Sequence, residues 1–296
     1  MDQNSRWLRN RTVSIIGLAK GTGKTTVLNA LLRQMRTDGG IRVPAVTSAG
    51  YDGEECGTQM TVSPEILISE GTLAATAAGL LSGFDFTAEV LACANTSSPL
   101  GDIYIFKAHS AGRAVLAGPS SSARLTAMKQ QLFDLGAECL LIDGAAGRRS
   151  VGAAEISDGI FLCTAPWIDL TQQQSAEKTL TAIKTYSLPV YAGEPDAIRL
   201  SGAVTDRTAA ALLREPDKLK GAVLTVEDPS KLLLSPTALS DLCRASKLTV
   251  LRRPELLSVC VNPVSPNGER TDVRDFIAQL AGETDIPIRN ILEETC

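Results

Sequence analysis

The sequence predicts an α/β protein with a mainly parallel sheet, an antiparallel insertion and a C-terminal α/β region. Three observations support this fold class. A β-branched run, a glycine-rich loop and an amphipathic pattern of helical period follow one another between Val13 and Met35. A continuous apolar run ends in an aspartate at 139–143, as in a central parallel strand buried on both faces. Strand and helix patterns then alternate towards the C-terminus, which is typical of α/β architecture.

The first of these segments has the pattern of a phosphate-binding P-loop, and so predicts a P-loop NTPase. Val13–Ile16 has the β-branched composition of a strand. Gly17, Gly21 and Gly23 lie in the loop that follows it. The helix that comes next has one apolar face, formed by Val27, Leu28, Leu31, Leu32 and Met35, and we expect it to end near Gly39-Gly40.

Each residue type in this loop has a chemical reason. Glycines let consecutive backbone N–H groups surround an anion, and the N-terminus of the following helix faces the same point. Lys24 reaches the terminal phosphates of a nucleotide, and the Thr25 hydroxyl can hold Mg²⁺. We therefore expect a nucleoside triphosphate to be bound by one continuous set of residues: Lys20, Gly21, Thr22, Gly23, Lys24, Thr25 and Thr26.

The spacing of the loop departs from the common G-x-x-x-x-G-K-[ST]. Leu18 stands five residues before Gly23, and Gly17 is one position further away. The loop is therefore either one residue longer than usual or lacks its first glycine. The longer spacing resembles that of dethiobiotin synthetase. A chance Gly-Lys-Thr in a glycine-rich turn is the alternative, and the flanking strand and amphipathic helix favour the P-loop.

Composition and charge restrict the class of protein further. The net charge of −4 and pI near 5.3 argue against a nucleic-acid partner held by an overall basic field. The sequence shows neither a signal-peptide pattern nor 18 uninterrupted apolar residues, so we expect a cytoplasmic protein without a membrane partner. Seven cysteines without a C-x-x-C pair, and the single His109, disfavour a zinc site.

Two aspartates are expected at the carboxyl ends of strands beside the P-loop, where ligands gather in open α/β sheets. The strand Arg42–Thr47 leads to Asp52, which could meet Mg²⁺ or an attacking group, although a generic acidic turn explains it equally well. The strand that begins at Cys139 ends at Asp143, a Walker B arrangement that would hold Mg²⁺ through water. The candidate catalytic residues are thus Lys24, Asp52 and Asp143, and the candidate metal ligands are Thr25, Asp52 and Asp143.

The region 63–116 predicts the antiparallel insertion. We expect strands at Ile66–Ser69, Phe86–Cys93, Asp102–Ala108 and Ala114–Ala117, with an alanine-rich helix at Thr72–Leu81. A polar cluster of Lys107, His109, Ser110 and Arg113 fits a solvated hairpin end better than a ligand site. A helix should then follow Gly118–Ser122 and end at Gly136. Serines at a helix start usually cap it, but free N–H groups there could also bind a second anion.

The best candidate boundary is the loop-like stretch Pro189–Pro195, which gives a P-loop nucleotide-binding domain at 1–192 and a C-terminal α/β region at 193–296. This C-terminal region either completes the same sheet or forms a smaller α/β lobe. The apolar strand Leu256–Val261 delivers Asn262 to a carboxyl edge, so we expect its amide near the base of the nucleotide. A simple Asn-Pro turn is the alternative, and Thr205-Asp206 is a rival for the same role. The other expected elements are strands 159–164, 198–204, 222–226 and 248–251 and helices 170–186, 206–213, 236–245 and 271–281.

Several phrases taken together resemble one family, the small reactivase subunit that accompanies the adenosylcobalamin- and pyridoxal-phosphate-dependent lysine 5,6-aminomutase, or its ornithine counterpart, in amino-acid-fermenting bacteria. These phrases span nearly the whole chain, at residues 16–26, 70–77, 116–121, 143–150 and 261–266. The resemblance implies an ATP-driven helper that binds the aminomutase, works with a partner reactivase subunit and exchanges a damaged corrinoid. The residues themselves indicate only the nucleotide site.

Three functions remain open on the sequence alone. The leading one is a Mg²⁺-dependent NTPase, with ATP and Mg²⁺ as its cofactors, that acts as a reactivase or chaperone subunit. The second is an ATP-dependent ligase or kinase of the dethiobiotin-synthetase type, with Lys20, Lys24 and Lys107 around a substrate carboxylate or carbamate. The third is a regulatory module that binds nucleotide without hydrolysing it. An Asn-Lys-x-Asp guanine motif is absent from the sequence, which modestly favours ATP over GTP.

Overall fold

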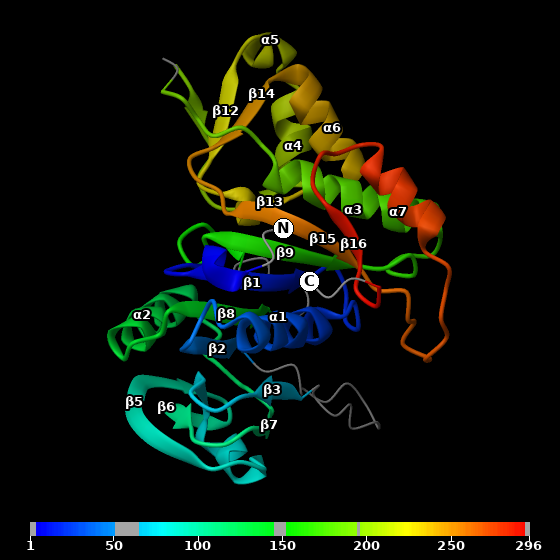
Figure 1. The fold of residues 1–296 in the computed structure, drawn as a ribbon. Coiled ribbons are helices and arrows are strands. Elements are labelled where there is room, and N and C mark those ends of the chain that lie inside the picture. Colours follow the sequence, from blue (N-terminus) through cyan, green and yellow to red (C-terminus); the bar gives the residue numbers. More distant parts are fainter. Residues whose placement is uncertain (1–3, 51–64, 145–151, 194–195, 294–296) are drawn as a thin grey trace.

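The centre of the protein is a nine-stranded sheet (Figure 1), seen in a computed structural model that describes residues 4–50, 65–144, 152–193 and 196–293. The strands from β16 to β4 in the sheet are parallel, and β6 and β5 form an antiparallel hairpin at one edge. The predicted mainly parallel sheet with an antiparallel insertion is therefore confirmed. In sheet order, the strands are β16 (Ile288–Asn290), β15 (Glu255–Val261), β9 (Gly159–Thr164), β1 (Thr12–Gly17), β8 (Cys139–Gly144), β2 (Pro44–Ala49), β4 (Leu73–Ala77), β6 (Gly101–Ala108) and β5 (Ala88–Ser98).

Helices cover both faces of this sheet. Successive side chains of β8 point to opposite faces, so Cys139 and Leu141 join the apolar cluster under α1, whereas Leu140 and Ile142 join the cluster under α2. Such two-sided burial explains the continuous apolar run in the sequence. Among the described residues, no helix combines the length and the apolar character that a membrane crossing requires. The helices packed around the main sheet are α1 (Lys24–Asp38), α2 (Ser122–Asp134), α3 (Gln172–Tyr186) and α7 (Arg274–Ala281).

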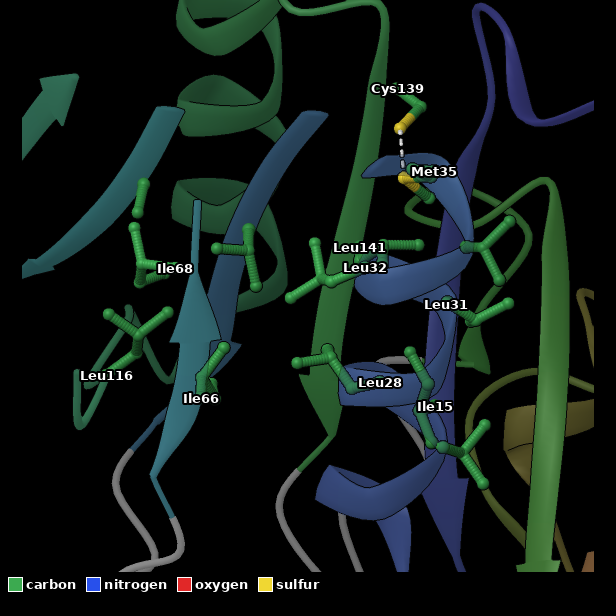
Figure 2. Close-up of a cluster of buried hydrophobic side chains, with 14 of the residues drawn as sticks. Ile15, Leu28, Leu31, Leu32, Met35, Ile66, Ile68, Leu116, Cys139 and Leu141 are labelled. Carbon is green, nitrogen blue, oxygen red and sulfur yellow. Dashed lines mark hydrogen bonds between the residues drawn. The ribbon is translucent and has the colours of Figure 1, made fainter. Parts of the chain in front are cut away.

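The predicted apolar face of α1 is fully used in the core. Figure 2 shows Leu28, Leu31 and Leu32 directed towards strand residues such as Ile15 and Leu141. Burial of each such side chain contributes about 1.5–3 kcal/mol, so this face fixes α1 against β1 and β8. At the far end of the helix, the Sγ of Cys139 lies 3.9 Å from the Sδ of Met35 (Figure 2), and burial raises the pKa of that thiol to about 12. The helix that follows the glycine-rich loop is thus anchored along its length.

The prediction of a helix at Thr72–Leu81 is wrong. Leu73–Ala77 forms β4, which pairs parallel with β2 and antiparallel with β6, and a short 3-10 helix follows at Ala78–Gly83. Every residue of β4 is buried. Alanine favours a helix intrinsically, but its small side chain also fits a strand covered on both faces, and sheet pairing outweighs local propensity here. The element is therefore part of the main sheet.

The region between α3 and β15 forms a smaller α/β unit. Its core is a three-stranded parallel sheet in the order β10-β12-β14, covered by α4 and α6 (Figure 1). The single strand predicted at 198–204 is two short strands, β10 and β11, in different sheets. β15 and β16 follow this unit and return to the main sheet. Its elements are β10 (Ile198–Arg199), β11 (Val204–Thr205), α4 (Asp206–Leu213), α5 (Pro216–Leu219), β12 (Val223–Val226), β13 (Leu232–Leu233), α6 (Pro236–Ala245) and β14 (Lys247–Val250).

Several other elements differ in smaller ways from those expected from the sequence. A short antiparallel pair, β3 (Ile66–Ile68) with β7 (Gly112–Ala114), lies outside the main sheet beside α1. The last helix, α7, begins at Arg274, three residues after the expected start at 271, and its N-cap residue Val273 makes no side-chain capping bond. Short 3-10 helices also occur at Ser5–Leu8 and Pro229–Lys231.

Candidate nucleotide-binding site

The glycine-rich loop joins the carboxyl end of β1 to the N-terminus of α1. A methyl group placed on Gly17 would lie 2.5 Å from the Oγ1 of Thr22 and 3.1 Å from the Cδ of Lys24. Only a residue without a side chain can bring the end of the strand so close to the turn of the loop. Gly17 therefore serves as the first glycine, and the loop is one residue longer than the common spacing.

The other end of the loop leaves the first N–H groups of α1 without a side-chain cap. The N-cap is Gly23, which has a left-handed φ of 86° and whose missing Cβ would collide with Ile291. The first backbone N–H groups of a helix have no partner inside the helix, and the helix dipole makes this end positive. An anion at this point satisfies both requirements, which is the physical basis of phosphate binding by such loops.

The two predicted metal-binding residues of the described chain lie in contact. β1 and β8 are parallel neighbours, and their register places Asp143 beside Ile15. The Oγ1 of Thr25 donates a hydrogen bond of 3.1 Å to the Oδ2 of Asp143. Thr25 is only 9% exposed and Lys24 only 7%, so both start at the base of the site and not on its rim. Hydroxyl and carboxylate oxygens are the hard ligands that Mg²⁺ prefers, and the donor set fits that ion.

Asp52 lies outside the described residues, so its predicted role is an expectation from its position after β2. The neighbouring end of β2 is described. Its Ser48 hydroxyl donates a hydrogen bond of 3.3 Å to the backbone oxygen of Asp143. This bond links the end of β2 to the end of β8.

Asn262 lies directly behind the P-loop. It follows β15, is 8% exposed, and donates from Nδ2 to the backbone oxygen of Gly21 at 2.8 Å. Its Oδ1 accepts a hydrogen bond of 3.0 Å from the N–H of Val264. The amide therefore connects the P-loop to the loop after β15. The rival pair at the start of α4 is engaged elsewhere: Thr205 caps that helix, and Asp206 accepts a hydrogen bond from the N–H of Ser235.

Trp167 is a residue of this site that the sequence reasoning missed. It follows β9, and a methyl group on Gly21 would lie 3.4 Å from its Cη2 and 4.0 Å from the Cγ of Pro266. The indole Nε1 is buried and has no hydrogen-bond partner within the described chain. An unsatisfied buried donor costs about 1–3 kcal/mol, which marks the position as unusual. A large aromatic residue just after an apolar strand, in a chain with 4% aromatics, was the available signal.

Two other polar features that the sequence predicts are also described by the structure. Around the insertion, His109 pairs with Glu89 at 3.3 Å and Arg113 with Glu65 at 3.1 Å, as expected of a solvated hairpin end. At the start of α2, the N-cap residue Ser121 makes no side-chain capping bond.

The described chain therefore has a mainly parallel α/β sheet with a glycine-rich loop between β1 and the N-terminus of α1. No protein-family model matches the chain, and no curated protein matches it. Among solved structures, the chain is similar to the signal recognition particle receptor FtsY from Elizabethkingia anophelis, with 9% sequence identity and a TM-score of 0.29. The match covers 91% of this chain and 65% of FtsY, so the chain spans less than two thirds of the length of that protein.

Proposed function

We propose that the chain is a Mg²⁺-dependent P-loop NTPase that binds and hydrolyses ATP. The observation that supports this most directly is the contact between Thr25 and Asp143 at the N-terminus of α1. A hydroxyl from the P-loop and a carboxylate from the neighbouring strand thereby meet where the uncapped N–H groups of the helix begin.

Each group has a definite task in this proposal. The N–H groups of the loop and of the first turn of α1 bind the phosphate oxygens, and Lys24 adds a positive charge beside the terminal phosphates. Thr25 and Asp143 would hold Mg²⁺, and Asp52 is proposed as a further contact from its place after β2. When bound, the metal ion neutralises charge that develops on the β- and γ-phosphates. Asn262 holds the loop in the conformation that presents these groups.

For the biological role, we propose a reactivase or chaperone subunit of an adenosylcobalamin-dependent aminomutase. The five sequence phrases at 16–26, 70–77, 116–121, 143–150 and 261–266 support this role, and the aminomutase and a partner reactivase subunit are the proposed partners. Slow basal ATP hydrolysis that the mutase stimulates is the expected behaviour. Phosphate release that depends on a small metabolite, without any protein partner, would instead indicate a ligase or kinase. The lengthened loop, which resembles that of dethiobiotin synthetase, favours this second candidate.

Calorimetry of the Lys24→Ala variant with ATP and Mg²⁺ tests the nucleotide site. A charge-assisted hydrogen bond contributes about 1.5–3 kcal/mol, so the affinity should fall by about 10- to 100-fold. Lys218→Ala is the matched control, because the Lys218 side chain is 75% exposed and pairs with the nearby Glu215 in the small α/β unit. Wild-type protein that binds neither ATP nor GTP with Mg²⁺, or equal binding by wild type and Lys24→Ala, would refute the proposal.

A further inference from the structure

The P-loop has two different sides. Asp143 comes from β8 on one side of β1, whereas Trp167 and Pro266 come from the loops after β9 and β15 on the other side. In a bound triphosphate the terminal phosphates lie with the metal ligands, because the metal ion neutralises their charge. The nucleoside must then leave the P-loop on the side of β9 and β15. Trp167 and Pro266 are therefore the ring-bearing side chains that it meets beyond Gly21.

The two rings are held in place by the sheet. β9 and β15 are parallel neighbours with Thr164 beside Val261, and the N–H of Asn262 donates to the backbone oxygen of Thr164 at 2.8 Å. Both following loops thus leave the sheet together and reach Gly21 from the same side. Trp167 is partly exposed and Pro266 is exposed, so the rings present apolar surface to a ligand. A packed aromatic ring and a rigid proline form a surface that needs little ordering when a flat molecule binds.

Two observations indicate stacking and not reading of the base edge. The amide of Asn262, which could have read an adenine edge, already bonds to Gly21 and Val264. The indole Nε1 of Trp167 is buried without a partner within the described chain, and a phenyl ring at the same place would avoid that cost. The larger ring is therefore disfavoured by local stability. Its extra π surface is the property that a base would use.

We propose that Trp167 and Pro266 form the platform on which the base of the bound nucleotide stacks, and that the site selects purines by stacking area without discriminating strongly between adenine and guanine. This inference rests on the proposed nucleotide site. It gives ATP and GTP similar affinities, within about 10-fold, because both purines offer the same two fused rings. CTP binds more weakly, because a single pyrimidine ring covers less of the indole.

Tryptophan fluorescence can follow the platform directly. The chain has two tryptophans. Trp7 precedes β1 and so lies at the amino ends of the strands, where its ring packs near Phe161, whereas Trp167 follows the carboxyl end of β9. Trp7→Phe therefore leaves Trp167 as the single reporter. In this background, ATP and GTP with Mg²⁺ should change the emission of Trp167 at saturation, and inorganic triphosphate should change it much less. Trp7→Phe itself should keep the wild-type affinities for all four ligands: ATP, GTP, CTP and triphosphate.

Trp167→Leu and Trp167→Phe separate stacking from packing in the otherwise wild-type chain. Trp167→Leu should weaken ATP and GTP binding by about 10-fold or more and leave triphosphate binding within 2-fold, with Trp167→Phe in between. The unfolding temperature of Trp167→Phe should equal or exceed that of the wild type, because the orphan N–H is gone. If the affinities for triphosphate and ATP fall together in Trp167→Leu, the stacking platform is refuted. GTP binding more than 100-fold weaker than ATP binding would refute it too. Neither result would contradict the proposed phosphate site in the P-loop. Wild-type protein that binds no triphosphate at all would refute the nucleotide site itself.

Discussion

Replacement of Asn262 by alanine tests whether its amide holds the P-loop. The side chain makes two partly buried hydrogen bonds: its Nδ2 donates to the oxygen of Gly21 at 2.8 Å, and its Oδ1 accepts from the N–H of Val264 at 3.0 Å. Each contributes about 1 kcal/mol, so the free energy of unfolding should fall by about 2 kcal/mol. The unfolding temperature should then fall by roughly 3 °C, because the entropy of unfolding grows with chain length and the chain has 296 residues.

The effect on binding follows from the bond to Gly21 alone. Without it the loop must be ordered when phosphate binds, which costs about 1 kcal/mol and weakens affinity about 5-fold. Because the phosphates bind this same loop, ATP and inorganic triphosphate should lose affinity equally. Asn262→Asp sharpens the test, since it keeps an acceptor for Val264 and removes only the donor to Gly21. We expect Asn262→Asp to lower the affinities for ATP and triphosphate at least as much as Asn262→Ala does.

Asn290→Ala is the matched control for this experiment. Asn290 ends β16, lies beside Val261 in the sheet, is 7% exposed and accepts one hydrogen bond of 3.0 Å from the N–H of Leu292. Its loss should lower stability by about 1 kcal/mol without changing triphosphate affinity. Calorimetry with both ligands decides the matter. If Asn262→Ala lowers the affinity for ATP but not for triphosphate, the amide contacts the base of the nucleotide, as the sequence analysis predicts. The loop would then be held by other contacts.

Two further predictions concern the metal and the effect of pH. Asp143→Asn keeps a hydrogen-bond acceptor for Thr25 but removes the carboxylate charge. The rate of phosphate release with Mg²⁺ should therefore fall by about 100-fold, while the affinity for nucleotide without metal changes little. Equal losses of rate and affinity would indicate misfolding. Burial alone would raise the pKa of Asp38, but hydrogen bonds from Ser5 and Gly40 outweigh it and lower the pKa below its usual value. The wild type should therefore have a higher free energy of unfolding than Asp38→Asn above the unfolded-state pKa of about 3.9, and this difference should disappear as the pH falls through the lower folded-state pKa. Urea unfolding from pH 7 to pH 2 measures it. A difference that persists at pH 2 would show that it does not come from the ionised carboxylate.

Local sequence signals were sufficient to predict the strand, glycine-rich loop and helix from β1 to α1, and also β8. The strand, loop and helix at Val13–Met35 and the apolar run before Asp143 each fit within about 25 residues or fewer, so periodicity and residue type determine them. The helix predicted at Thr72–Leu81 failed because alanine suits both states. Its conformation depends on β2 and β6, which flank it in space. Propensity alone could not supply that information.

Contacts between distant segments were the other limit. The strand pattern placed Asn262 at the correct edge of the sheet, but only the register of β15 against β9 brings its amide to Gly21, 241 residues away in the sequence. The same register brings Trp167 and Pro266 to one point. A sequence shows which residues end strands. It does not show which neighbouring strand ends meet.

The position of β15 and β16 decides how much of the chain the P-loop requires. These strands come after the small α/β unit, yet they lie in the main sheet and their following residues, Asn262 and Ile291, contact Gly21 and Gly23. The small unit contacts the rest through α6, which packs against α3, and through Arg252, which pairs with Glu227 at 2.9 Å and with Glu155 at 3.9 Å. Residues 193–296 therefore serve two structural purposes. The stretch 198–250 builds a separate core, and the stretch 255–291 completes the sheet edge that supports the loop, so the P-loop geometry depends on both halves of the chain.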